Sequence, residues 1–301
     1  RRPGGGIPVY DIAVIGGGPA GLSAAIQVRA RNKSVLVVSG DDRDNPLYKT
    51  SRIDNYLGFY NVTGPELLER FRTHAGQMGA ERRDGRVLNL LAVGGAYYLS
   101  IGSEVEQARA VVLATGVVRA KKYPGEAERL GAGVSYCATC DGMLYRGKPV
   151  AVVGRSGDAP REASYLKSLG CQVVYAAAKR PETLEEDIPF VQANRLEITG
   201  AQTVTALVAD GAPIPCSGVF ILRDAVAPTD LLPQLETREN AIRVDRSMST
   251  SVPGVFAAGD CTGGPLQVSK AVGEGLVAAL SAAEYLDRRG SEPPAGASSR
   301  T

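Results

Sequence analysis

Residues 10–21 read Tyr10-Asp11-Ile12-Ala13-Val14-Ile15-Gly16-Gly17-Gly18-Pro19-Ala20-Gly21, a short apolar strand followed by a glycine-rich turn. An alanine-rich helix at 22–30 and an apolar strand at 34–38 complete a strand–helix–strand unit. In this setting the glycine pattern is typical of a dinucleotide-binding turn, because glycine lets the backbone and the helix N-terminus approach a pyrophosphate closely. The sequence therefore predicts that a dinucleotide binds at Gly16, Gly18, Pro19, Ala20 and Gly21.

The composition of the chain limits the classes of function that it can have. The chain has 301 residues, enough for two domains, and its 44% hydrophobic and 22% charged residues are typical of a globular protein. A net charge of +2 gives no reason to expect nucleic-acid binding, and no apolar run is long enough to span a membrane. Five cysteines in 301 residues are too few for a scaffold held together by disulfides, and they fit a reducing compartment. We therefore expect a cytoplasmic protein with no nucleic-acid or membrane partner.

A pair of cysteines carries the strongest chemical signal. Cys137-Ala138-Thr139-Cys140 is followed directly by Asp141. Two thiols at this spacing can close a small disulfide and accept two electrons, and an adjacent acid can manage the proton. The same spacing can supply half of a zinc site, but zinc needs four ligands. Because the other cysteines stand singly and His74 is the only histidine, we predict no metal site and a redox-active dithiol.

Further segments of the chain accompany the glycine turn and the cysteine pair. They are Arg52-Ile53-Asp54-Asn55-Tyr56-Leu57-Gly58-Phe59, Val112-Leu113-Ala114-Thr115-Gly116, Pro124-Gly125-Glu126, Val255-Phe256-Ala257-Ala258-Gly259-Asp260, Gln267 and the helix at 272–279. In their order and spacing these segments resemble those of the low-molecular-weight thioredoxin reductases, over nearly the whole chain. The resemblance implies an α/β fold of two Rossmann-like, three-layer ββα dinucleotide-binding domains, the second inserted in the first.

The same resemblance implies the domain boundaries. Residues 1–117 and 246–290 would form the FAD-binding domain, and residues 118–245 an NADPH-like domain that carries the dithiol. Residues 291–301 would be a flexible tail. The residues support the insertion independently, because Val150-Ala151-Val152-Val153-Gly154 opens a second strand–turn–helix unit, with a helix at 162–169 and a strand at 173–176.

FAD is the cofactor that the resemblance implies. Beyond the glycine turn, the implied FAD-binding residues are Ser39, Gly40, Leu47, Asn55, Ala114, Thr115, Gly116, Gly259, Asp260, Gln267 and Val268. Asp260 would be the acid on the flavin side, with a turn-capping Asp as the alternative. Asp41 and Asp42 follow Ser39-Gly40 and are expected on a solvated loop face. The family's Gly-Gly-Gln-Leu segment is Asp44-Asn45-Pro46-Leu47 here, so the flavin face is expected to be covered differently.

In the family that the chain resembles, reduced flavin passes two electrons to the dithiol, which then reduces a protein disulfide. This implies that Cys140 receives the electrons and that Cys137 attacks the partner disulfide. Asp141 would donate or relay a proton, with an N-cap or an ion pair as the alternative. The implied partner is thioredoxin or a similar small dithiol protein, and we expect a homodimer.

The second glycine turn departs from the family pattern. In Gly154-Arg155-Ser156-Gly157-Asp158-Ala159, Ser156 replaces the middle glycine, and its Cβ intrudes where the backbone would meet a pyrophosphate. Within residues 176–183, one cation falls roughly in place of the basic cluster that binds the 2′-phosphate of NADPH. We therefore favour an electron donor other than NADPH, such as a ferredoxin-like protein. An FAD-dependent dithiol oxidase that uses oxygen and a non-catalytic FAD-binding redox sensor stay open.

Overall fold

The computed structural model describes residues 9–102, 104–117, 122–223 and 227–291. The chain divides into two compact units, of which the first comprises 1–118 and 227–301 and the second comprises 119–226. Residues 227–245, expected in the inserted domain, pack with the first unit. Helix α5 (Pro228–Leu231) contacts β4 (Val87–Val93), and β16 (Ala241–Ile242) contacts the turn after β17 (Val255–Ala257). The expected tail lies outside the described residues beyond Ser291.

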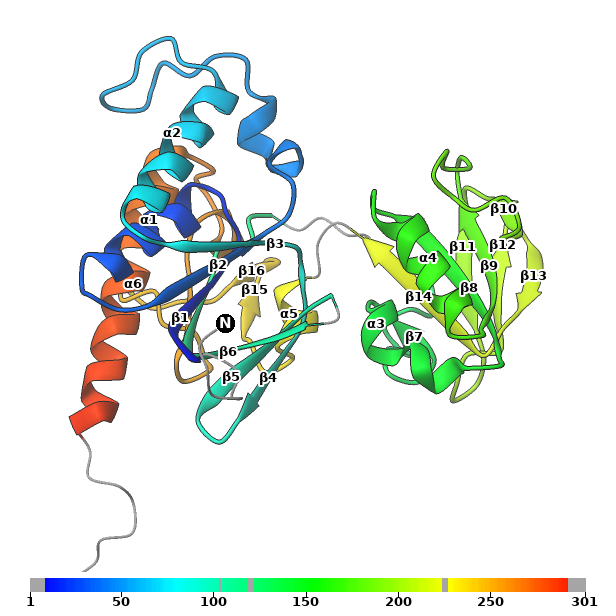
Figure 1. The fold of residues 1–301 in the computed structure, drawn as a ribbon. Coiled ribbons are helices and arrows are strands. Elements are labelled where there is room, and N and C mark those ends of the chain that lie inside the picture. Colours follow the sequence, from blue (N-terminus) through cyan, green and yellow to red (C-terminus); the bar gives the residue numbers. More distant parts are fainter. Residues whose placement is uncertain (1–8, 103, 118–121, 224–226, 292–301) are drawn as a thin grey trace, which may run out of the picture. The chain divides into compact units, whose positions relative to one another are not determined.

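A mixed sheet forms the centre of the first unit (Figure 1). Its order is β3-β2-β1-β6-β5-β4, and β17 pairs with the carboxyl-terminal half of β6. Strands β1, β2, β3, β6 and β17 pair in parallel, whereas β4 and β5 form antiparallel pairs. The strands are β1 (Val9–Ile15), β2 (Val35–Ser39), β3 (Glu81–Asp84), β4 (Val87–Val93), β5 (Ala96–Ile101), β6 (Glu104–Leu113) and β17 (Val255–Ala257), with a separate hairpin of β15 (Thr237–Arg238) and β16.

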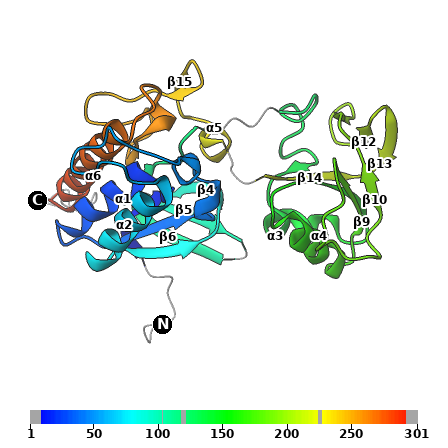
Figure 2. The same cartoon turned by 90° about the horizontal axis from the view of Figure 1, so that it is seen from above.

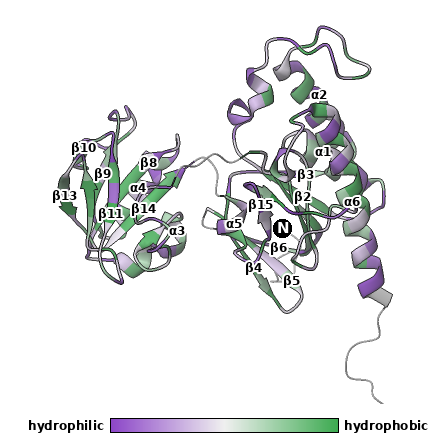
Figure 3. Cartoon of the chain, turned by 180° about the vertical axis from the view of Figure 1, so that it is seen from behind, coloured by the Kyte–Doolittle hydropathy of each residue, from purple (hydrophilic) through white to green (hydrophobic). Residues whose placement is uncertain are grey.

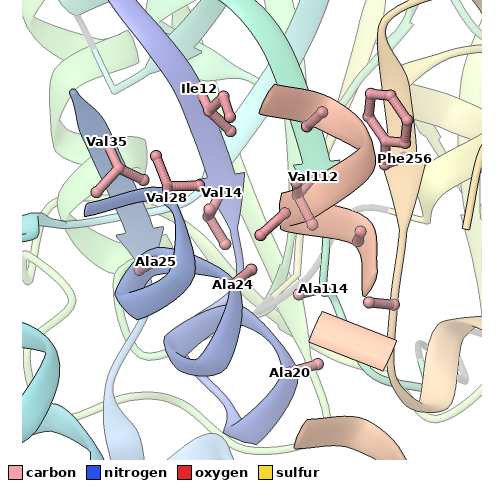
Figure 4. Close-up of a cluster of buried hydrophobic side chains, with 14 of the residues drawn as sticks. Ile12, Val14, Ala20, Ala24, Ala25, Val28, Val35, Val112, Ala114 and Phe256 are labelled. Atoms are coloured by element: carbon pink, nitrogen blue, oxygen red, sulfur yellow. The ribbon is translucent and has the colours of Figure 1, made fainter. Parts of the chain in front are cut away.

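Two helices rich in small residues pack together on one face of this sheet. Figures 1 and 2 show α1 (Pro19–Arg29) and α6 (Val268–Ser291) side by side. Alanines on both helices let them approach closely, and a Cβ on Gly275 would lie 2.1 Å from the Ala20 carbonyl oxygen. Figure 4 shows the core that results, in which Ala20, Ala24 and Ala25 pack with apolar side chains of the strands.

The remaining helices of the first unit are α2 (Gly64–Gln77) and the 3₁₀ helices η1 (Asp42–Asp44), η2 (Pro46–Lys49) and η4 (Asp260–Thr262). Helix α2 begins with a capping box, in which the Thr63 side chain accepts from the Glu66 N–H and Glu66 accepts from the Thr63 N–H. No helix in the described part of the chain has both the length and the apolar character needed to cross a bilayer.

The second unit has three layers. Its parallel sheet, ordered β10-β9-β8-β14-β7, has a small antiparallel sheet, β11-β12-β13, on one face and helices α3 and α4 on the other. Strand β14 is buried along most of its length and is mostly green in Figure 3. The elements are β7 (Val134–Ser135), α3 (Ala138–Asp141), η3 (Gly142–Tyr145), β8 (Pro149–Arg155), α4 (Ala159–Ser168), β9 (Gln172–Ala177), β10 (Phe190–Gln192), β11 (Leu196–Thr199), β12 (Ala206–Ala209), β13 (Ala212–Pro215) and β14 (Gly218–Arg223). This arrangement confirms the predicted α/β, three-layer fold class.

Candidate active site

The first glycine turn joins β1 to α1 in a conformation that requires glycine. Gly16 has a φ of +118°, and a Cβ there would lie 2.1 Å from the Ala114 carbonyl oxygen. A Cβ on Gly21 would lie 1.9 Å from the Gly16 carbonyl oxygen. Helix α1 begins at Pro19 without a capping side chain and without an acidic residue in its first turn. The positive end of the helix dipole is therefore available to an anionic ligand.

The other predicted FAD-binding segments of the first unit lie at the carboxyl ends of strands, at the same edge of the sheet. The Gly16 N–H donates to Val38 O over 2.8 Å, the Ala114 N–H to Ile15 O over 2.8 Å, and the Ala258 N–H to Leu113 O over 2.9 Å. Because parallel strands bring their carboxyl ends together, the turn lies at one edge with the predicted Ser39, Gly40, Ala114, Thr115, Gly116, Gly259 and Asp260. A Cβ on Gly40 or Gly116 would meet nothing within 4 Å, which leaves open space beside them.

Helix α6 fixes the turn that carries Asp260. The Glu274 carboxylate accepts from the Gly259 N–H and the Thr262 hydroxyl, each over 2.9 Å, and from Lys270 over 3.0 Å. Lys270 also donates to the Gly259 carbonyl over 2.7 Å. Burial raises the pKa of Asp260, and Lys270 partly opposes this effect. Asp260 therefore lies on a turn that hydrogen bonds with Glu274 and Lys270 stabilise.

The four other predicted FAD residues lie in two groups. Asn55 donates to the Gln267 side chain over 3.0 Å, which joins two segments far apart in the sequence. Leu47 and Val268 pack on the same hydrophobic cluster, around Ile53 and Leu67. The structure thus brings Asn55 to Gln267 and Leu47 to the cluster that receives Val268.

Two further polar residues lie at this edge, and neither was among the predicted FAD-binding residues. Asn45 Nδ2 lies 3.2 Å from where a Cβ on Gly18 would stand, so this departure from the family pattern covers the glycine turn. Arg82, on β3, donates to Ser39 Oγ over 3.1 Å and pairs with Asp42 over 3.4 Å. Asp42 is therefore held in ion pairs, with a side chain only 19% exposed, and the expectation of a solvated loop residue is wrong. No sequence signal pointed to Arg82, because the parallel pairing of β3 with β2 was not foreseen.

The dithiol lies between β7 and α3 of the second unit. Cys137 and Cys140 form a disulfide in which Cys137 is buried, at 5% exposure, and Cys140 is exposed. The Cys140 N–H points at Cys137 Sγ over 3.0 Å, and the Thr139 hydroxyl lies 3.4 Å from the same sulfur. Two donors near one sulfur stabilise its thiolate once the disulfide is reduced. Ala138, fully buried, anchors the short helix in the core.

Asp141 is held by Ser135, which belongs to none of the motifs quoted above. Ser135 donates to Asp141 Oδ2 over 2.6 Å and accepts from the Cys137 N–H over 3.1 Å. Asp141 directly precedes η3, but its side chain does not cap that helix, so the alternative of an N-cap is not adopted. Ser135 stands two residues before Cys137, and this proximity is the one sequence signal that could have indicated it.

The carboxyl ends of β8 and β14 are filled by side chains of the chain itself. Arg155 and Arg223 are directly paired residues of these two strands, and their guanidinium groups lie 5.9 and 5.3 Å from the Tyr123 ring centre. Glu126, fully buried, forms an ion pair with Arg223 over 2.6 Å. We call Tyr123, Glu126, Arg155 and Arg223 the switch-point cluster. On the adjacent strand, Tyr175 Oη lies 1.7 Å from where a Cβ on Gly154 would stand, so this glycine too is closely packed.

Comparison with known proteins agrees with this geometry. The model of the pyridine nucleotide-disulphide oxidoreductase family matches residues 10–275. The chain belongs to that family. It is 30% identical to the thioredoxin reductase of Listeria monocytogenes over 93% of this chain and 94% of the relative.

Two solved structures of the same family are similar along nearly the whole chain. A ferredoxin-flavin thioredoxin reductase from Clostridium acetobutylicum has 41% identity and a TM-score of 0.83, over 95% of this chain and 100% of that one. The atypical thioredoxin reductase TRi from Desulfovibrio vulgaris Hildenborough has 32% identity and a TM-score of 0.71, over 94% and 100%. This pyridine nucleotide-disulphide oxidoreductase is therefore a low-molecular-weight thioredoxin reductase by family, an FAD-dependent oxidoreductase.

The first unit fits FAD. The uncapped start of α1 and the crowded Gly16 and Gly21 form a cradle for a pyrophosphate, and the open space at Gly40 and Gly116 admits a ligand along the same edge. When bound, FAD supplies a carrier that takes up and releases two electrons. The residues of this edge would bind and orient the carrier, and Asp260 lies on a turn that α6 holds in place.

Proposed function

We propose that this chain reduces the disulfide of thioredoxin, or of a similar small dithiol protein, with electrons that a ferredoxin-like protein supplies in place of NADPH. The observation that carries the proposal is the switch-point cluster at the carboxyl ends of β8 and β14. In open α/β sheets the ligand binds where the strand order reverses. Here β8 connects through α4 to β9 on one side, and β14 pairs with its other side, so the reversal falls between β8 and β14.

The cluster lies where the switch-point rule would place a nicotinamide dinucleotide. Tyr123 stacks near the guanidinium groups of Arg155 and Arg223, and the latter is paired with the buried Glu126. A pyrophosphate would have to displace an aromatic ring and compete with an internal carboxylate for Arg223. Ser156 adds a side chain in the turn itself.

The residues near the end of β9 offer little to a 2′-phosphate. Arg180 donates to the carbonyls of Glu185 and Ile188, over 2.8 and 3.4 Å, and its guanidinium lies 5.7 Å from the Phe190 ring centre. This arginine is thus engaged within the protein, and Lys179 is the neighbouring exposed cation. A single lysine is a poor substitute for several bidentate guanidinium groups.

The relatives support a donor of another kind. The Clostridium acetobutylicum structure is that of a ferredoxin-flavin thioredoxin reductase, and it is 41% identical to this chain. The names of the relatives also favour a reductase over the dithiol oxidase and the redox sensor that the sequence left open.

The donors near Cys137 Sγ support the role assigned to its thiolate. In the proposed reaction Cys140 accepts two electrons, after which the S–S bond breaks. Cys137, whose thiolate has two nearby donors, attacks the partner disulfide and displaces one partner thiolate. Cys140 then attacks the mixed disulfide and releases the second partner thiolate. Two electrons and two protons pass to the partner, and the Cys137–Cys140 disulfide is restored.

We further propose a homodimer in the cytoplasm. The homodimer is expected from the resemblance of this sequence to the thioredoxin reductases. The cysteines outside the active pair, Cys171, Cys216 and Cys261, are all free and buried, which fits a reducing compartment.

Flavin absorbance distinguishes the donors. The purified holoprotein is mixed anaerobically with NADPH, with NADH, or with chemically reduced ferredoxin, and oxidised thioredoxin is then added. We expect ferredoxin to bleach the flavin and support thioredoxin reduction, while the nicotinamide nucleotides leave the spectrum unchanged. Rapid bleaching by NADPH would show the donor assignment to be wrong, and a ferredoxin-reduced flavin that never reduces thioredoxin would refute the acceptor.

A further inference from the structure

We propose that Ser135 is a positioning residue of the dithiol. Its hydroxyl holds the Asp141 carboxylate against the backbone of Cys137, where the carboxylate accepts the proton that the dithiol releases when it attacks a disulfide. The proposal rests on the proposed function, because it assigns the geometry of the proton acceptor in that same reaction.

The contacts of the Ser135 hydroxyl connect the acid to the cysteine. Ser135 Oγ lies 2.6 Å from Asp141 Oδ2 and 3.1 Å from the Cys137 amide nitrogen, which donates to it. The same oxygen is 3.2 Å from the Cys137 carbonyl oxygen. A hydroxyl has one proton to donate, and the shorter contact to a carboxylate is the stronger bond. Ser135 therefore donates to Asp141 and accepts from Cys137.

The strand beneath Ser135 makes this position rigid. Ser135 is 4% exposed and ends β7, where it pairs with Phe220 of β14. The Val219 N–H also donates to Gly133 O over 2.8 Å, which fixes the strand just before it. A hydroxyl on a buried, sheet-paired residue keeps its geometry better than one on a free loop.

The far side of the dithiol is equally constrained. Ala138 is fully buried among residues of β8 and α4, and a Cβ on Gly142 would lie 2.9 Å from side-chain atoms of Leu166 and Leu169. The backbone on both sides of Asp141 is thus packed. The orientation of the carboxylate itself depends on its side-chain torsions, and the Ser135 bond is the contact that restrains them.

The reaction can be written with its protons. A reduced dithiol and an aromatic disulfide give the Cys137–Cys140 disulfide, two aromatic thiolates and two protons. Each protein thiol gives its proton to the Asp141 carboxylate, which passes it to water, and the thiolate then attacks. The Cys137 thiolate breaks the S–S bond of the aromatic disulfide, forms a mixed disulfide and releases one aromatic thiolate. The Cys140 thiolate breaks the mixed disulfide, forms the Cys137–Cys140 bond and releases the second aromatic thiolate. A carboxylate moved by about 1 Å loses up to about a hundredfold in rate.

A chemical disulfide tests this step without thioredoxin, ferredoxin or NADPH. The holoprotein is reduced with dithiothreitol, freed of the reductant, and mixed with 5,5′-dithiobis(2-nitrobenzoate), and release of the coloured thiolate is followed. We expect Ser135→Ala to slow the release about tenfold to a hundredfold, and Ser135→Thr, which retains the hydroxyl, to recover most of the rate. The matched control is Ser164→Ala, which removes a hydroxyl of the same unit that donates to Pro160 O.

Combining Ser135→Ala with Asp141→Asn distinguishes a role in positioning Asp141 from a purely structural role of Ser135. If Ser135 acts through Asp141, Ser135→Ala has no further effect on the rate once Asp141 is Asn. An unchanged rate in Ser135→Ala, or an equal loss in both backgrounds, would overturn the proposal, the latter because the Cys137 N–H bond alone would then explain it. Failure of the proposed function leaves this readout intact, since thioredoxin and the electron donor take no part in it.

Discussion

Arg223 donates two hydrogen bonds to the Glu126 carboxylate, over 2.6 and 2.7 Å, at the carboxyl end of β14. The same carboxylate accepts from the Tyr123 N–H and from the Tyr136 hydroxyl, each over 2.8 Å, so that both oxygens have two donors. Glu126 is fully buried. Burial alone would raise its pKa, but the bonds from Arg223, Tyr123 and Tyr136 lower the pKa below the ordinary 4.5. The pair therefore links the segment before the dithiol to the filled switch point.

We expect Glu126→Gln to destabilise the protein by about 3–5 kcal/mol, because the substitution leaves the Arg223 charge without its buried partner. Since the folded-state pKa of Glu126 is depressed, its contribution is present above the unfolded-state pKa and is lost as the pH falls through the folded-state pKa. The wild type should thus lose more stability than the variant as the pH falls below about 5 and through the folded-state pKa of Glu126. Urea denaturation at pH 7 and through the acid range measures both effects.

An exposed ion pair provides the control for this variant. Glu236 accepts from Arg243 over 3.0 Å, and both side chains are more than half exposed. Glu236→Gln should change the stability by less than about 1 kcal/mol. Equal losses from the two substitutions would show that the burial of Glu126 does not matter.

Ser156→Gly tests whether the altered turn alone excludes NADPH. The substitution restores the glycine pattern at 154–159 but leaves the switch-point cluster in place. We expect the variant still to show no flavin bleaching by NADPH and no heat of NADPH binding by calorimetry. Tight NADPH binding to this variant would mean that Ser156, and not the side chains of Tyr123 and Arg223, closes the site.

The sequence was sufficient for features that depend on local pattern. The glycine turn, its flanking strand and helix, and the second strand–turn–helix unit were all predicted, because glycine and short apolar runs act within a few residues. The family resemblance placed Ala114–Gly116 among the FAD-binding residues, and in the structure the Ala114 N–H donates to Ile15 O, directly before the glycine turn.

Other features depend on pairing between distant positions. Glu126 and Arg223 are 97 residues apart, and neither residue type indicates in the sequence that it has a buried partner. Arg82 reaches Ser39 because β3 pairs with β2, a contact that no motif records. Residues 227–245 were assigned to the wrong unit because the packing of α5 against β4 is likewise tertiary. Contacts between positions far apart in the chain thus could not be predicted from a single sequence.

The three remaining cysteines should be inert in the native protein. Burial raises the pKa of Cys216 to about 11 and that of Cys261 to about 11, and it raises the pKa of Cys171 as well. Because the thiolate is the reactive form, few of these groups are ionised at pH 8. We expect no fast-reacting thiol in the oxidised protein and two after reduction. A thiol titration with and without denaturant checks this, and a third fast thiol in the folded, reduced protein would contradict it.

Gly21→Ala tests the cradle for FAD. The new Cβ would lie 1.9 Å from the Gly16 carbonyl oxygen, so the turn must shift away from the ligand that α1 faces. Overpacking of this kind costs about 1–3 kcal/mol, which corresponds to FAD affinity weaker by roughly tenfold to a hundredfold. The FAD content of the purified protein and its recovery on adding FAD measure the loss. Gly76→Ala in α2, where a Cβ would meet nothing within 4 Å, should retain full FAD content and gain slightly in stability. Normal FAD binding by Gly21→Ala would mean that the turn does not approach the cofactor.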